Sequence, residues 1–418
     1  MTTFMKKLWR DKRGNALIIG AGSLPLLIGS VGLATDTVQW VTWKRQLQRA
    51  ADSAAFAGAY AKFQDESASA AVSQDLTSNN HVWVPLLGGY PQVSEPADTG
   101  PYTRAVEVSL AVQRSLSFSS MFMSSAPVIR VTARAAAIDS DVFCAIAKET
   151  NNTSGIIIQG SANVNLGCGM ISNSPHASIS VGVNGNAHNV TADPVAGVGG
   201  VPPINGVTNE ISYHLAQPDP YENLYDTDIP ASEPCGNMSS HVVSVSGGVT
   251  TLEPGCYSGN NQFKFTGGTT HLQPGTYYLD GTDFDAQGGT ITGTGVTIVL
   301  TGSNPGQIKL NGNATLQLSA PTADPSDPFY KMLIIQSPNA TNSNNVNNLN
   351  GTNSSSFDGA VYFPNQEIEF SGSSGSMTKC VMVVARRINF SGNANLQNDL
   401  AGCTAATKVK GKVIRLIA

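Results

Sequence analysis

The sequence predicts a mainly β protein with one N-terminal transmembrane helix, a small α+β region and a long parallel, right-handed β-helix. Three observations carry this prediction. A stretch of 19 residues from Ala16 to Ala34 contains no charged side chain. Short glycine-flanked segments recur about every 20 residues in the C-terminal half. Only 13% of the residues are charged and 42 of 418 are glycine, which suits stacked strands and turns.

The length allows two or three domains of roughly 100–200 residues each. We expect a basic stub, a transmembrane helix (about 15–34) and an extended Ala-rich helix in residues 1–64. A small α+β membrane-proximal domain should follow over 65–140, and the repeat-built β-helix over 141–418. The net charge of −5 gives no reason to expect a nucleic-acid partner.

The uncharged stretch is close to the ~20 residues that cross a bilayer, so it should contact membrane lipid. Basic residues dominate the segment before it: Lys6, Lys7, Arg10, Lys12 and Arg13, against Asp11. The positive-inside rule keeps this end cytoplasmic and exports the rest. A cleaved signal peptide is the alternative, because Gly32-Leu33-Ala34 resembles a cleavage site. The apolar run exceeds the ~7–15 residues of a signal peptide, so we expect an uncleaved anchor.

Beyond the span the pattern remains helical to about Gln64. Alanine, a strong helix former, is frequent between Ala50 and Ala61. An Ala-rich face lets another helix approach closely, but it could equally pack on the chain's own domain.

Two runs in this region carry a family resemblance. They are Arg13-Gly14-Asn15-Ala16, followed by the span with Pro25, and the segment from Lys44 to Ala55. Together they resemble the N-terminal module of TadE/TadG-like proteins, which belong to the tight-adherence (Flp) pilus assembly systems. The resemblance implies a single-pass protein of the bacterial inner membrane with a periplasmic bulk. Its role would be structural, in pilus assembly or adhesion, with other pilus-assembly or envelope proteins as partners.

One position departs from a related pattern. Pilins cut by prepilin peptidase resemble one another in carrying a Glu five residues after the cleaved glycine. Counted from Gly14, that place holds Ile19. We therefore expect the helix to act as an anchor and not as a processed pilin segment.

The region over 65–140 should contain a helix at Ala68–Leu76 and strands near Val106–Val112 and Val128–Ala137, from their periodicities. Asp65-Glu66-Ser67-Ala68-Ser69 matches the DxSxS metal loop of von Willebrand A domains. Such a loop must follow a buried strand, whereas the preceding residues predict a helix. We therefore expect no metal site here.

Internal repeats indicate the fold of the C-terminal region. The segment Gly247–Tyr257 recurs as Gly267–Tyr277 at an offset of 20, and Gly288–Thr292 follows at an offset of 21. A second pattern begins at Gly160, Gly185, Gly312 and Gly392. One unit is too small to bury a core, but stacked coils would bury a continuous one. A β-sandwich built from hairpins is the alternative.

The six cysteines fit the same stacking and an oxidising compartment. Adjacent coils bring equivalent Cα atoms to about 4.8 Å, within the ~4.4–6.8 Å that a disulfide needs. Spacings of 24, 21 and 23 residues therefore suggest three candidate disulfides: Cys144 with Cys168, Cys235 with Cys256, and Cys380 with Cys403.

Two segments near the C-terminus are distinctive. Asn339–Asn353 has few apolar residues, so we expect a mobile loop that projects from a coil. Lys408–Ile417 predicts a terminal strand whose charges could blunt a sheet edge.

Asp280, Asp283 and Asp285 form the best acidic cluster. Glycoside hydrolysis needs two carboxylates about 5–9 Å apart, and carboxylates are also the ligands that Ca²⁺ takes. Asp beside Gly is typical of turns, however, and no Lys or Arg lies near the cluster in sequence. Motifs of common enzymes, such as HExxH, GxSxG and the P-loop, are absent. We expect no enzyme, metal or cofactor. The alternative is a membrane-anchored carbohydrate-binding or carbohydrate-active β-helix with a surface polysaccharide as ligand.

Overall fold

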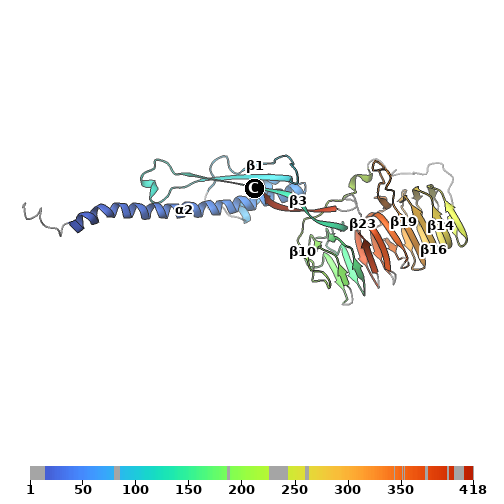
Figure 1. The fold of residues 1–418 in the computed structure, drawn as a ribbon. Helices are drawn as coiled ribbons and strands as arrows, with labels where there is room; N and C mark the ends of the chain where they lie inside the picture. Colours follow the sequence, from blue (N-terminus) through green and yellow to red (C-terminus); the bar gives the residue numbers. More distant parts are fainter. Residues whose placement is uncertain are drawn as a thin grey trace, which may run out of the picture. The chain divides into compact units, whose positions relative to one another are not determined.

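The computed structural model divides the chain into two compact units, residues 1–139 with 413–418, and residues 140–412 (Figure 1). The structure describes residues 15–79, 85–185, 189–225, 243–258, 263–342, 344–350, 352, 354–371, 375–392, 395–399 and 409–417.

The first unit is built on helix α2 (Asn15–Phe63), which is 49 residues long. This confirms a helix that continues well past the apolar stretch, as the sequence predicts. Its last third buries an alanine face (Ala51, Ala54, Ala55, Ala59). The face packs inside its own unit, because a Cβ added at Gly58 would lie 2.9 Å from side-chain atoms of Val106 and Val72.

Two short turns of helix follow, α3 (Ala68–Gln74) and the π-helical η2 (Asp75–Asn79). Strands β1 (Gln92–Ser94), β2 (Thr103–Gln113) and β3 (Val128–Ala147) then form an antiparallel sheet. The two predicted strands are therefore confirmed. β2 alternates buried and half-buried side chains, because one face covers α2 and the other meets water.

The second unit is a parallel β-solenoid with three sheets, which we name A, B and C. Sheet A contains β13 (Gly255–Ser258), β15 (Gly275–Asp280), β17 (Val296–Thr301), β20 (Met332–Gln336), the middle of β22 (Ser356–Phe370), the middle of β23 (Gly375–Phe390), the end of β3, β6 (Gly169–Ser172), β9 (Val195–Gly197) and β10 (Glu210–Ser212).

Sheet B contains β11 (Val243–Val245), the start of β14 (Phe263–Leu272), the start of β16 (Phe284–Thr294), β18 (Ile308–Leu310), β21 (Val346–Leu349), the ends of β22 and β23, β4 (Ile156–Gln159) and β7 (Val181–Asn184). Sheet C contains β12 (Val249–Leu252), the ends of β14 and β16, β19 (Ala314–Ser319), the starts of β22 and β23, β24 (Asn395–Asp399), β5 (Asn163–Asn165) and β8 (Asn189–Thr191).

The pairings among these described strands are parallel, so the sandwich alternative is wrong and the β-helix prediction is confirmed. The offsets between the sequence repeats equal the separations between paired residues on adjacent coils. Val249 pairs with Thr269 at the predicted offset of 20, and Thr269 pairs with Thr290 at 21. The predicted terminal strand is present as β25 (Val409–Ile417).

The coils do not stack in sequence order. The first coil lies against the last one, because Ala145 pairs with Val383, Ile156 with Ile388 and Asn163 with Asn395. From this seam the chain winds outward through β6 to β10. It then starts again at β11, at the opposite end, and winds back coil by coil to β23 (Figure 1). The chain therefore enters and leaves the solenoid near its middle.

Large apolar side chains fill the interior. The rings of Phe263, Phe265 and Phe284 pack with centroids 5.1–5.6 Å apart, and Phe370 stacks on Phe390 at 5.4 Å. Neighbouring coils thus contribute the same kind of side chain to one continuous core, which is the physical reason for the repeat.

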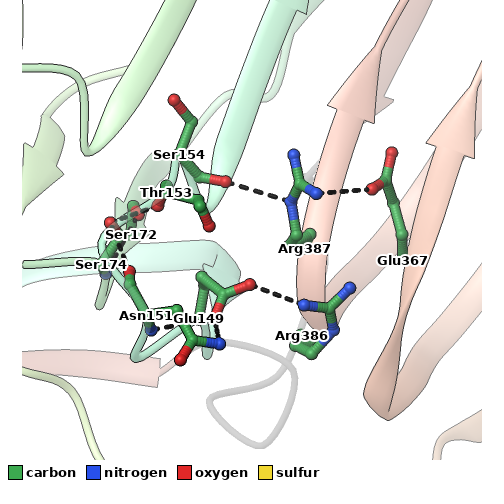
Figure 2. A network of polar contacts seen from close by, with 9 residues as sticks. All are labelled: Glu149, Asn151, Thr153, Ser154, Ser172, Ser174, Glu367, Arg386 and Arg387. Atoms are coloured by element: carbon green, nitrogen blue, oxygen red, sulfur yellow. Dashed lines mark hydrogen bonds and ion pairs between the residues drawn. The ribbon is translucent and has the colours of Figure 1, made fainter. Parts of the chain in front are cut away.

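The seam between first and last coils carries a polar network (Figure 2). The buried Glu149 carboxylate accepts a hydrogen bond from Arg386 at 2.7 Å. Arg387 donates to the Ser154 carbonyl at 3.1 Å and pairs with Glu367 at 3.4 Å. The contacts of Arg386 with Glu149 and of Arg387 with Ser154 join residues 237 and 233 positions apart, so they tie the first coil to the last one.

Part of the outer surface of sheet A is covered by residues 213–225. The Asp219 carboxylate pairs with Lys148 and accepts a hydrogen bond from the Tyr362 hydroxyl at 2.7 Å. The Tyr221 ring packs edge-on against Tyr362 at 5.4 Å. Burial, and then the negative charge of Asp219, raise the pKa of Tyr221. This segment therefore covers strands of the seam from outside.

The prediction of a projecting Asn-rich loop over Asn339–Asn353 is wrong for Val346–Leu349, whereas the described residues from Asn339 to Asn345 do lie in a loop. Residues Val346–Leu349 form β21, and Asn347 is fully buried. Its side chain accepts from the Ile308 amide at 3.0 Å and donates to Gln366 at 3.0 Å. A buried Asn is tolerated here because its amide has partners on both neighbouring coils.

Candidate functional site

The first candidate site is the apolar surface of α2. Of the described helices, α2 alone is long and apolar enough to cross a membrane. Its large apolar side chains are exposed: Leu24, Leu26, Leu27, Ile28, Val31 and Leu33. A helix that exposes leucine on several sides is costly in water and suited to lipid. This surface is consistent with a single-pass membrane anchor.

Aromatic residues with cationic neighbours follow the span. The Lys44 ammonium lies 5.3 Å from the ring centre of Trp40, and the Arg114 guanidinium lies 4.2 Å from that of Trp43. Trp is enriched at the boundary between hydrocarbon and water, where its ring is amphipathic. These pairs therefore lie just after the apolar stretch, at positions suited to such a boundary.

The β2–β3 connection rests on α2 from Gly32, near the end of the apolar stretch, to Gln39. Asp36 is 2% exposed, and its carboxylate accepts hydrogen bonds from the amides of Phe118 and Ser119 and from the Ser119 hydroxyl. A Cβ added at Gly32 would lie 2.4 Å from the Phe118 ring. The glycine thus permits close approach, and the Asp36 charge is satisfied by hydrogen bonds.

The DxSxS segment spans the turn between α2 and α3 (Asp65–Ser67) and the first two residues of α3. Asp65 forms an ion pair with Arg104, and Ser67 caps α3 by accepting from the Ala70 amide at 3.3 Å. The segment follows a helix, as predicted, so its oxygens are not presented at the end of a buried strand. Its polar groups stabilise the turn.

Two lysines that are distant in sequence lie beside the acidic cluster at Asp280–Asp285. On sheet B, Lys264, Asp285 and Lys309 occupy equivalent positions on three successive coils. Lys264 pairs with Asp285 at 3.3 Å, and Lys309 pairs with Asp283, which also accepts from the Gln307 amide at 2.8 Å. The carboxylates are thus engaged in a charge ladder across coils.

A polar groove of about 460 Å³ adjoins this ladder. It is lined by Asp285, Gln287, Lys309, Asn311, Asn348 and Asn350, with Leu310 and Val346. Amide and charged groups arranged this way can hydrogen-bond a polar ligand. The spacing of the coils could have predicted these lysines from the sequence, because Lys264 lies 21 residues, about one coil, before Asp285.

Among the cysteines, Cys144 and Cys168 form a disulfide with Cα atoms 6.0 Å apart, as predicted from the coil spacing. Cys256 is also disulfide-bonded. The side chains of Cys235, Cys380 and Cys403 lie outside the described residues, so the other two pairings stay predictions.

Comparison with known proteins identifies the N-terminal region. Residues 14–61 match the family described as putative Flp pilus-assembly TadE/G-like, and this range coincides with α2. A search of curated proteins and a search of solved structures each found no significant match. The chain therefore carries an N-terminal TadE/G-like Flp pilus-assembly domain, followed by a C-terminal β-solenoid.

Proposed function

We propose that this protein is a structural component of a Flp/Tad-type pilus or surface-adhesion system. In this proposal α2 anchors the chain in the inner membrane with its N-terminus in the cytoplasm. The solenoid stands on the periplasmic side as an interaction domain for other pilus-assembly or envelope proteins. The match of residues 14–61, which coincides with a helix exposing an apolar surface, is the observation that carries this proposal.

A non-enzymatic role is part of the proposal. Asp283 and Asp285 are the best acidic pair, and both are held by lysine side chains. Each carboxylate thus already has a cationic partner within the ladder. Their arrangement therefore supports a structural ladder.

A deletion strain tests the role directly. We expect loss of pili and of surface adhesion, restored by the wild-type gene and equally by Asp283→Asn/Asp285→Asn. Restoration by the double variant would support the view that Asp283 and Asp285 have a structural role in the ladder and no catalytic one. Intact piliation and adhesion in the deletion strain would contradict the proposed function.

The polar groove on sheet B favours a second candidate, a carbohydrate-binding solenoid. The chain in detergent micelles would be titrated with envelope polysaccharides. Saturable binding that is lost in Asn348→Leu, which removes an amide from the groove wall, would support this candidate. Equal binding by the variant would exclude the groove as the binding site.

A further inference from the structure

The tip of the β2–β3 hairpin, residues 115–127, exposes a compact apolar surface. Met121 is 75% exposed, Phe122 76% and Met123 47%. The Phe122 ring packs on Phe118 at 5.4 Å, so the tip is organised around an aromatic pair. Three adjacent large apolar side chains on a loop are costly in water, and such patches mark a contact surface.

The tip also lacks charge. No Asp, Glu, Lys or Arg occurs from Ser115 to Ile129, and the polar residues of the tip are serines. Cationic Arg114 lies at the base of the hairpin, stacked on Trp43. A loop that binds an ordinary protein surface usually carries some charged rim, whereas hydrocarbon excludes charge.

The contacts of the tip with α2 show how far along the helix axis the tip lies. The uncharged span from Ala16 to Ala34 covers about 28 Å at 1.5 Å per residue, close to the thickness of the hydrocarbon core. Phe118 contacts α2 at Gly32, which lies inside the outward end of that span. Trp43 lies eleven residues further out, about 16 Å along the helix. The tip thus lies beside the last turns of the span.

The Asp36 contacts explain how a carboxylate is accommodated at this level. Both oxygens accept hydrogen bonds from the tip itself, through Phe118 and Ser119. The Ser117 hydroxyl also donates to the Gln39 side chain at 3.3 Å. The tip therefore covers the Asp36 carboxylate, and the side chains that it exposes instead are those of Met121, Phe122 and Met123.

We propose that the hairpin tip at Met121–Met123 inserts into the outer leaflet of the membrane that α2 spans, as a second lipid contact of the same unit. This inference rests on the proposed anchoring by α2. Two attachment points would restrict rotation and tilt of the first unit about the helix axis, which a single helix alone does not do.

Site-specific photocrosslinking in the full chain tests the insertion. p-Benzoylphenylalanine would replace Phe122 or, as a second position, Met121. The protein would be reconstituted in vesicles of phosphatidylethanolamine and phosphatidylglycerol with radiolabelled acyl chains. Leu27, exposed in the span, is the positive control, and Tyr102, an exposed aromatic just before β2, is the matched negative control.

We expect lipid adducts at 121, 122 and 27, with at least tenfold less at 102. Adducts at 27 but not at 121 or 122 would overturn the insertion and leave the anchor intact. Absence of lipid adducts at 27 as well would mean that the proposed anchoring itself fails. Crosslinks from 122 to a second protein chain instead of lipid would also overturn the inference, since the tip would then be a protein interface.

Discussion

We expect the Glu149–Arg386 ion pair to stabilise the seam between the first and last coils. Glu149→Gln removes the negative charge and leaves Arg386 facing a neutral amide. The Glu149 side chain is 2% exposed and that of Arg386 is 20% exposed. Breaking a fully buried pair costs about 3–5 kcal/mol, because one charge remains buried. Since Arg386 keeps some access to water, we expect a smaller loss, about 2 kcal/mol.

Urea unfolding of the full chain in detergent measures this loss. With a slope of about 3 kcal/mol/M, the midpoint should fall by roughly 0.7 M. Hydrogen exchange gives a local readout, because the Lys148 amide bonds to the Ala385 carbonyl at 2.8 Å across the seam, and the Ile388 amide to that of Gly155 at 2.9 Å. Both amides should exchange faster in the variant.

The double variant Glu149→Met/Arg386→Met is the control. It removes both charges and keeps side-chain volume, so its stability should lie within about 1 kcal/mol of wild type. The reasoning is refuted if Glu149→Gln costs less than about 0.5 kcal/mol, or if the double variant loses as much as the single one.

Three further predictions follow from turns, the disulfide and the hairpin. Gly268→Ala should cost about 1–3 kcal/mol in urea unfolding, because Gly268 has φ +78° and an added Cβ would lie 2.7 Å from the Gly248 carbonyl. Gly247→Ala, with nothing within 4 Å of its Cβ, is the control and should change little. Cys144→Ser/Cys168→Ser should lose about 3 kcal/mol in urea unfolding under oxidising conditions, because it opens a loop closed over a sequence separation of 24. Gly32→Val should displace Phe118 and speed chymotryptic cleavage within residues 115–127, whereas Gly29→Val, which has open space, should not. Equal cleavage of these last two variants would contradict the packing of the tip on α2.

Local patterns were sufficient for the main elements, although not for β21, which forms in the Asn-rich segment. The uncharged run and the alanines predicted α2, the alternation at Val106–Val112 predicted β2, and the 20-residue repeats predicted parallel coils. These signals are readable because backbone periodicity and side-chain burial repeat over short distances along the chain. For the same reason the 24-residue spacing of Cys144 and Cys168 indicated a bond between neighbouring coils.

The sequence by itself thus determined that this chain has an apolar helix and a repeat-built β-solenoid. Only the tertiary structure decided the order of the coils, the lysines beside Asp283 and Asp285, and the hairpin tip on Gly32. The physical reason is distance along the chain. The repeats make every coil compatible with several neighbours, so which coils meet depends on the path between them. Arg386 contacts Glu149, which lies 237 residues earlier in the sequence, and no local pattern predicts that contact.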